Sequence, residues 1–150
     1  MKALSSISLA IALAASLAAP AHAGAIHDAG LFTSVLAAND DGSTGPVGLG
    51  FAANINGTSY LNTYVNNNGN ITFTGALSTF TPGAISTGSF GPIIAAFFAD
   101  VDTRASGSSD VLYGANTLGG RNVFGVNYIN VGVYNQQILQ QLPDDPDGSQ

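Results

Sequence analysis

Apolar and polar residues alternate along residues 59–65, with the two-residue period of an extended strand. The alternation places one set of side chains on each face, namely Leu61, Thr63 and Val65 on one and Tyr60, Asn62 and Tyr64 on the other. One of these faces must pack against a core. Asn-Gly pairs lie at residues 56–57 and 68–69, before and after this strand. Because Asn-Gly between strands is the strongest short-range signal for a β-hairpin, the pattern predicts two consecutive hairpins.

A different pattern occupies residues 93–101, where apolar residues follow one another almost without interruption. A half-exposed strand alternates in character, whereas a strand buried on both faces is continuously apolar. We therefore predict a central, buried strand over this run. It follows a connection rich in Gly, Pro, Ser and Thr at residues 79–92.

Shorter apolar stretches are separated by turn-forming residues. The apolar residues 31–38 form an element of ambiguous type that ends at the turn-forming cluster of residues 39–46. A short strand is predicted at residues 111–113 and a longer one at residues 122–134. The pair Gly119-Gly120 marks the turn between them.

The composition favours strands joined by tight turns, because Gly, Asn, Ser, Thr and Ala are abundant and Val, Ile, Phe and Tyr supply the apolar positions. We predict a single domain of the all-β or β-dominated class, an antiparallel or mixed β-sheet sandwich with short helical segments. Residues 136–142 have helical spacing and good helix formers. Residues 143–150 predict a solvated, acidic tail.

The N-terminus has the pattern of a signal peptide. Lys2 precedes an apolar stretch over residues 7–19, and Ala21-His22-Ala23 matches a signal peptidase site. The apolar stretch is shorter than the ~20 residues that span a bilayer. We therefore expect export with cleavage after Ala23, a secreted or cell-surface location, and no membrane insertion of the mature chain.

The charge balance narrows the choice of partners. The formal net charge is −6, and once Lys2 is removed only Arg104 and Arg121 remain to oppose nine aspartates. Such a chain lacks the basic surface that binds nucleic acid or anionic lipid. It also has no cysteine, so a secreted domain of this sequence must be stabilised by burial alone.

Three ordered blocks of the sequence resemble the nidogen-like (NIDO) extracellular domain. Residues 64–73 resemble that family's V-N-x-N-G-x-I-T-F hairpin, and residues 94–104 resemble its I-A-P-F-W-A-D-V-D-T-R strand, with Ala96 for the proline and Phe98 for the tryptophan. Residues 122–134 resemble the next strand of the family. The resemblance implies a non-enzymatic module of adhesion and matrix proteins, whose partner is an extracellular protein or a matrix or polysaccharide component.

The resemblance also suggests how the chain is divided. We expect a signal peptide at residues 1–23, a lead segment at 24–46, the nidogen-like domain at 47–135 and a polar acidic tail at 136–150. The family pattern continues through a further strand that this chain lacks after residue 135. We therefore expect a C-terminally incomplete domain that leaves a strand edge unpaired.

The carboxylates after the apolar run are candidate calcium ligands. Asp100 and Asp102 would emerge on one face of an extended segment, and Asp110 follows a short Gly-Ser loop. Three carboxylates with backbone carbonyls form the oxygen set that Ca²⁺ prefers, although no twelve-residue calcium loop is present. The alternative is that Arg104 neutralises Asp100 or Asp102 and fixes the loop. A calcium- or carbohydrate-binding module is thus the second hypothesis for function.

Few residues of the chain are candidates for a catalytic role. There is no Cys or Glu, His22 leaves with the signal peptide, and His27 lies next to the new N-terminus. The Ser and Thr residues have no positioned base, which leaves hydrolysis by the pair Asp100 and Asp102 as the enzymatic alternative. The run Asn66-Asn67-Asn68 offers amides for sugar hydroxyls, but we interpret it as turn chemistry because Asn tolerates left-handed conformations.

Overall fold

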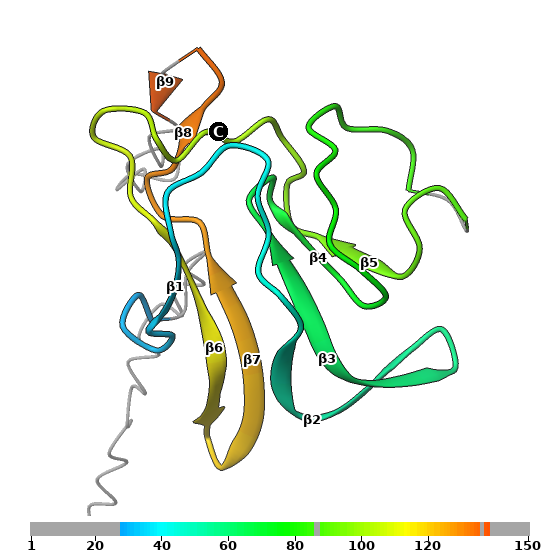
Figure 1. The fold of residues 1–150 in the computed structure, drawn as a ribbon. Coiled ribbons are helices and arrows are strands. Elements are labelled where there is room, and N and C mark those ends of the chain that lie inside the picture. Colours follow the sequence, from blue (N-terminus) through cyan, green and yellow to red (C-terminus); the bar gives the residue numbers. More distant parts are fainter. Residues whose placement is uncertain (1–27, 86–87, 136, 139–150) are drawn as a thin grey trace, which may run out of the picture.

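The computed structural model describes residues 28–85, 88–135 and 137–138, and this part of the chain consists of short strands and connecting loops (Figure 1). The strands are β1 (Ser34–Leu36), β2 (Val47–Ile55), β3 (Thr58–Asn66), β4 (Asn70–Thr72), β5 (Ile93–Ala95), β6 (Val111–Leu118), β7 (Arg121–Asn127), β8 (Gly132–Val133) and β9 (Gln137–Ile138).

Helical segments are absent from these residues, so the prediction of short helices finds no support there. Residues 137–138, within the segment predicted to be helical, form β9. The rest of that segment, the signal peptide and the acidic tail lie outside the described residues. No helix long and apolar enough to cross a bilayer occurs in the described part.

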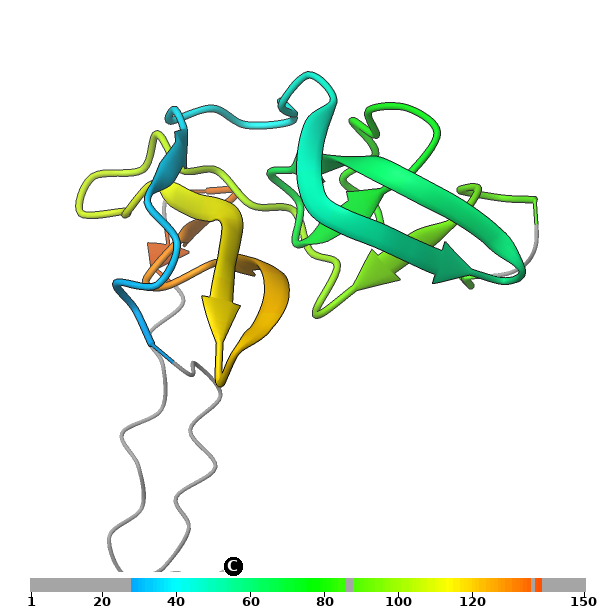
Figure 2. The same cartoon turned by 90° about the horizontal axis from the view of Figure 1, so that it is seen from below.

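Two antiparallel sheets form the body of the molecule. One has the strand order β1-β6-β7 and the other β2-β3-β4-β5. The strands β8 and β9 pair with each other as a separate two-stranded ribbon. The predicted β-dominated class is confirmed. Every strand pairing in the described part is antiparallel, so the mixed alternative is not found there. Figures 1 and 2 show the sheets next to each other, with β2 beside β6 and β7.

The predicted hairpins are confirmed. The turn between β2 and β3 has positive φ angles at Asn56 (50°) and Gly57 (86°), and Gly119 (56°) and Gly120 (75°) do the same between β6 and β7. Two positive φ angles in a two-residue loop match the twist of the flanking strands. The turn between β3 and β4 is longer, because Asn66 pairs with Asn70, and here Gly69 has a φ of 80°.

The core lies between the sheets. Its buried apolar side chains come from both sheets and from the loops at one end: Leu36, Val65, Val101, Val111 and Val131. In β3 the buried face is the one that carries Thr63 and Val65, whereas Leu61 at the open end of that face is 65% exposed.

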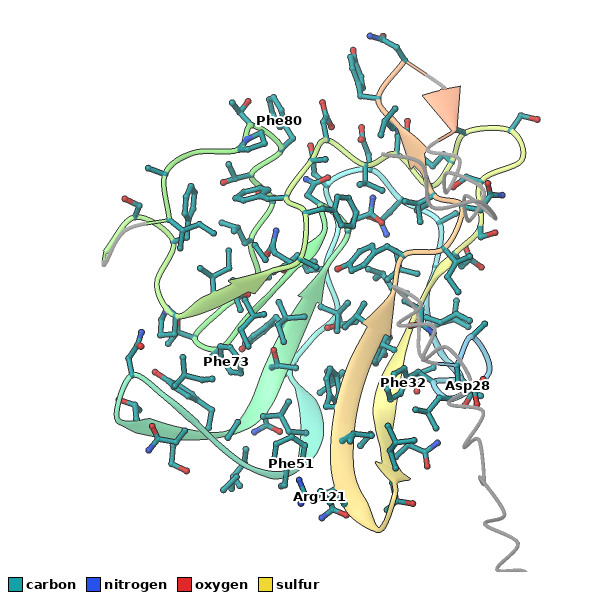
Figure 3. The ribbon with its side chains drawn as sticks, turned by 180° about the vertical axis from the view of Figure 1, so that it is seen from behind. Asp28, Phe32, Phe51, Phe73, Phe80 and Arg121 are labelled. Atoms are coloured by element: carbon teal, nitrogen blue, oxygen red, sulfur yellow. The ribbon has the colours of Figure 1, made fainter. Side chains whose placement is uncertain are left out.

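Gly125 in β7 lies against the ring of Phe32, which Figure 3 labels. A methyl group on Gly125 would overlap this ring.

The predicted central strand over residues 93–101 is wrong. Only Ile93–Ala95 forms a strand, and it lies at the edge of its sheet with Ile94 half exposed. Beyond it, the amides of Ala99 and Val101 bond to the backbone and side chain of Asn68 instead of to a neighbouring strand. The run is continuously apolar because its residues contact different surfaces in turn: Phe97 packs on Tyr128, and Val101 enters the core.

The predicted strand over residues 122–134 is interrupted. It forms β7 and β8, and between them Asn130 adopts a φ of 53°, which an extended strand cannot accommodate. The strand predicted at residues 111–113 continues to Leu118 as β6.

Candidate functional site

Three consecutive asparagines in the turn between β3 and β4 organise the loops at one end of the molecule. Asn66, Asn67 and Asn68 are at most 1% exposed. None of them adopts a positive φ, which in this turn is found at Gly69. The run forms a turn, as predicted, but the left-handed conformation expected of its asparagines is not found: their amides are internal hydrogen-bonding groups.

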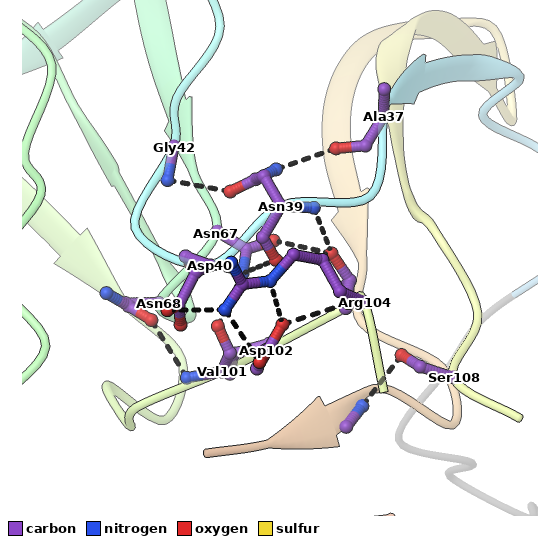
Figure 4. A network of polar contacts seen from close by, with 12 residues as sticks. Ala37, Asn39, Asp40, Gly42, Asn67, Asn68, Val101, Asp102, Arg104 and Ser108 are labelled. Atoms are coloured by element: carbon purple, nitrogen blue, oxygen red, sulfur yellow. Dashed lines mark hydrogen bonds and ion pairs between the residues drawn. The ribbon is translucent and has the colours of Figure 1, made fainter. Parts of the chain in front are cut away.

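Asn67 connects two loops that are distant in sequence (Figure 4). Its Nδ2 donates to the carbonyls of Asn39 at 3.2 Å, Asp40 at 2.6 Å and Val101 at 2.5 Å. Its Oδ1 accepts a hydrogen bond of 3.3 Å from the hydroxyl of Thr103. The side chain thereby fixes the loop before β2 against the loop after β5.

Asn68 holds the same two loops from the other side. Its Nδ2 donates to the Asp41 carboxylate at 2.9 Å and to the Thr79 carbonyl at 3.2 Å, and its Oδ1 accepts the amide of Val101 at 2.8 Å. Because the side chain of Asn68 is immobilised in the interior, it also orients the carboxylate of Asp41.

Arg104 binds two carboxylates next to these asparagines. It donates to both oxygens of Asp102, from Nε at 2.8 Å and from Nη2 at 2.9 Å, and from Nη2 to Asp40 at 2.7 Å (Figure 4). The hydrogen bonds from Arg104 hold the pKa of Asp102 below its ordinary value. Both oxygens of this sequence-predicted metal ligand are thus engaged by Arg104, as the alternative hypothesis of a neutralising arginine anticipated.

A cluster of three carboxylate side chains does form, but its members differ from the predicted ones. Single oxygens of Asp40, Asp41 and Asp100 lie within 4.8 Å of one another. Asp100 is the member that the sequence predicted, whereas Asp110 is exposed immediately before β6 and is not part of this cluster. Asp40 and Asp41 belong to residues 39–46, which we interpreted only as a turn. The many turn-forming residues of this segment gave no sign that its two aspartates would join Asp100.

These carboxylates line an open hollow of about 310 Å³, which we call the acidic hollow: Asp40, Asp41, Phe80, Asp100 and Tyr134. The aromatic side chains of Phe80 and Tyr134 are 51% and 57% exposed. Phe80 lies on the long connection between β4 and β5 (Figure 3). The amide of Tyr134 donates to the carbonyl of Asp100 at 3.0 Å, which ties the hollow to β8.

The acidic hollow has an excess of negative charge. The pKa of Asp100 is raised by desolvation and then by the charges of Asp40, Asp41 and Asp102. Desolvation also raises the pKa of Asp40, in spite of its ion pair with Arg104. Asp40 Oδ1 is buried and has no hydrogen-bond partner among the described residues. A positively charged group in the hollow would relieve the repulsion among these carboxylates.

Comparison with known protein families identifies the family of this chain. The protein-family model described as NIDO related matches residues 21–142, a span that contains every residue lining the acidic hollow. No solved structure matches the chain significantly.

Proposed function

Because this chain belongs to the NIDO-related family, as the three sequence blocks predicted, we propose that it is an exported, non-enzymatic module for extracellular adhesion or protein interaction. The acidic hollow is the surface through which it binds. The observation that carries this proposal is that three clustered carboxylates and two half-exposed aromatic rings line the same hollow.

The chemistry of the acidic hollow favours a partner with a basic side chain. An arginine guanidinium forms paired hydrogen bonds with carboxylates and also stacks on aromatic rings. Phe80 and Tyr134 supply the rings, and Asp41 and Asp100 supply carboxylates that no arginine of the chain is bonded to in the described part. Arg104 shows this mode of binding on the neighbouring Asp102.

A neutral sugar fits the acidic hollow less well. Sugars stack on aromatic rings and donate hydrogen bonds to carboxylates, but they bring no positive charge. Desolvation raises the pKa values of Asp40 and Asp100, and the charges of the neighbouring carboxylates raise them further. The charge of a cation offsets this cost and a neutral sugar hydroxyl does not, so a basic protein surface is the favoured partner.

The residue types present support binding over catalysis. The described residues contain no His, Cys, Glu or Lys, so the acidic hollow has no neutral base that could activate a hydroxyl nucleophile. Its aspartates are accounted for by the hydrogen bonds and charge interactions described above.

Binding of a short arginine-rich peptide by calorimetry tests the proposal, with the same peptide carrying neutral citrulline as the control. We expect the arginine peptide to bind, the citrulline peptide to bind much more weakly, and the affinity to fall as salt is added. Phe80→Ala, Tyr134→Ala and Asp41→Asn should each weaken binding by roughly three- to tenfold, because each removes one contact worth about 1 kcal/mol.

Asp110→Asn is the matched control, since Asp110 is an exposed carboxylate outside the acidic hollow. It should leave the affinity unchanged. Equal losses for Asp41→Asn and Asp110→Asn would show that binding depends on net charge alone and would refute the site.

Calcium is a second candidate ligand of the same carboxylates. Asp40, Asp41 and Asp100 have oxygens within 4.8 Å of one another, and the buried Asp40 Oδ1 has no partner in the described part. Ca²⁺ accepts six to eight oxygens in flexible geometry, and a cluster of this kind offers several of them.

Thermal unfolding with and without Ca²⁺ tests this candidate. Calcium at one hundred times its dissociation constant should stabilise the fold by ~2.7 kcal/mol, and a chelator should reverse the shift. Asp41→Asn should abolish the shift and Asp110→Asn should preserve it. The reverse pattern would favour the sequence-predicted set of Asp100, Asp102 and Asp110, and a flat titration would exclude calcium.

A further inference from the structure

The chain contains two Asn-Gly dipeptides, and the fold places them in opposite environments. Asn56-Gly57 forms the exposed tip of the hairpin between β2 and β3, whereas Asn68-Gly69 lies in the buried turn between β3 and β4. The two sites share the same reactive groups, so any difference in their chemistry must come from the fold.

Asn-Gly is the dipeptide in which asparagine deamidates most readily. The backbone nitrogen of the glycine attacks the side-chain amide carbon, a C–N bond closes a five-membered succinimide, and ammonia leaves. Water then opens the ring to aspartate or isoaspartate. Glycine favours the attack because it has no Cβ to hinder the approach.

Asn56 is accessible to this reaction. Its side chain is exposed, and a Cβ on Gly57 would meet no atom within 4 Å among the described residues. The Gly57 N–H, whose nitrogen is the nucleophile, donates to Oδ1 of Asn54 at 3.0 Å. This hydrogen bond retains the proton that must leave before the attack, so Asn54 should slow the reaction.

Asn68 is held away from the same reaction. Its Nδ2 and Oδ1 are bonded to Asp41, Thr79 and Val101, and ring closure requires the side chain to leave these partners. The residue is 1% exposed, and the ring of Phe97 lies over Gly69. Reaction therefore waits for unfolding, which lowers its rate by ~10³-fold or more in a domain of ordinary stability.

We propose that Asn56 is a site of spontaneous deamidation in the folded protein and that Asn68 reacts only in molecules that unfold. Conversion of Asn56 adds a negative charge, and as isoaspartate one backbone atom, at the tip of an exposed hairpin. Conversion of Asn68 places a second carboxylate against Asp41 and removes the donor that bonds to it. The first product keeps the fold, and the second cannot regain it.

Peptide mapping by mass spectrometry tests the proposal on the purified full chain, incubated in mildly alkaline buffer either folded or in denaturant. The folded sample should gain the amide-to-acid mass shift at Asn56 and not at Asn68, and the denatured sample should gain it at both. Conversion of Asn68 at similar rates in the two samples would overturn the protection by the fold. An unmodified Asn56 in the folded sample would overturn the exposed site.

Asn54→Ala tests the restraint on the hairpin, with Asn62→Ala as the control because Asn62 is also exposed in this pair of strands. Asn54→Ala should accelerate deamidation of Asn56, and Asn62→Ala should leave its rate unchanged. Circular dichroism confirms that each variant is folded. Equal rates in both variants would show that the hydrogen bond from Gly57 to Asn54 does not control the reaction.

Discussion

Single buried amides fix the loops of this molecule. Asn66, like its two neighbours, has both ends of its side chain satisfied: Nδ2 donates to Asn70 and Thr72, and Oδ1 accepts from Ser43 and Leu77. A buried amide without partners costs free energy, whereas a fully bonded one specifies a single arrangement of its neighbours. These residues therefore select the loop conformation that brings the carboxylates of the acidic hollow together.

Asn67→Ala should destabilise the fold by about 3 kcal/mol. The substitution removes the donor to the buried carbonyl of Val101 and to the part-buried carbonyl of Asp40, and each unsatisfied buried group costs ~1–3 kcal/mol. Denaturant unfolding measures the change. Asn62→Ala is the control, since Asn62 is exposed on β3, the strand that leads into this turn, and it should change the free energy of unfolding by less than about 0.5 kcal/mol.

Local pairs at the site were predictable from the sequence, and distant ones were not. Asp102 and Arg104 are two residues apart, so their ion pair could be anticipated. Asp40 and Asp41 join Asp100 only because Asn67 and Asn68 hold their loop, and no local pattern indicates which loop an asparagine will bond. An asparagine-rich turn has the same composition whether its side chains face solvent or the interior.

At the scale of elements, each hairpin is encoded in its own turn. Asn56-Gly57 and Gly119-Gly120 supply the positive φ angles that the connections require, so these elements could be predicted from a few residues. The run over residues 93–101 could not, because apolar character does not show which surface a residue contacts. Phe97, which we expected inside a central strand, is 36% exposed at the edge of the molecule.

Comparison of Gly57→Ala with Gly69→Ala separates backbone strain from packing in two turns. The φ angles of the two glycines are similar, 86° and 80°, so the backbone cost should be about 1–2 kcal/mol at each. At Gly69 a Cβ would also lie 3.0 Å from the Phe97 ring, so Gly69→Ala should be the more destabilising variant in denaturant unfolding.

Phe97→Ala in the Gly69→Ala background provides the check. In this double variant Gly69→Ala should lose the part of its destabilisation that comes from the Phe97 ring. Additive effects of the two substitutions on the free energy of unfolding would show that the added methyl group does not contact Phe97. Phe97→Ala alone should cost less than the ~3–5 kcal/mol of a fully buried phenylalanine, because part of its ring is exposed.

For the molecule as a whole, the acidic hollow links stability to pH. The folded-state pKa of Asp100 is raised, so its charged form destabilises the fold above that pKa, and stability is regained as the pH falls through it. The lowered pKa of Asp102 acts in the opposite sense, because the stability from its pair with Arg104 is lost at more acidic pH, as Asp102 is protonated.

Asp100→Asn should therefore be more stable than the wild-type protein at neutral pH, by of order 0.5 kcal/mol, since an exposed charge interaction has that size. The difference should vanish as the pH falls below the raised pKa of Asp100. Thermal unfolding over a series of pH values measures it, and Asp110→Asn serves as the control. A less stable Asp100→Asn at neutral pH would mean that Asp100 contributes favourable contacts that outweigh the repulsion.

The mixed character of the interior affects how stability depends on temperature. In the described part of the chain, the largest fully buried side chains are four valines and six asparagine or threonine residues. Exposure of apolar surface on unfolding raises the heat capacity, and exposure of polar surface lowers it. The heat-capacity increment should therefore fall below the usual ~12–15 cal/mol/K per residue. A small increment gives a shallow stability curve, so this domain should lose little of its maximum stability on either cooling or moderate warming.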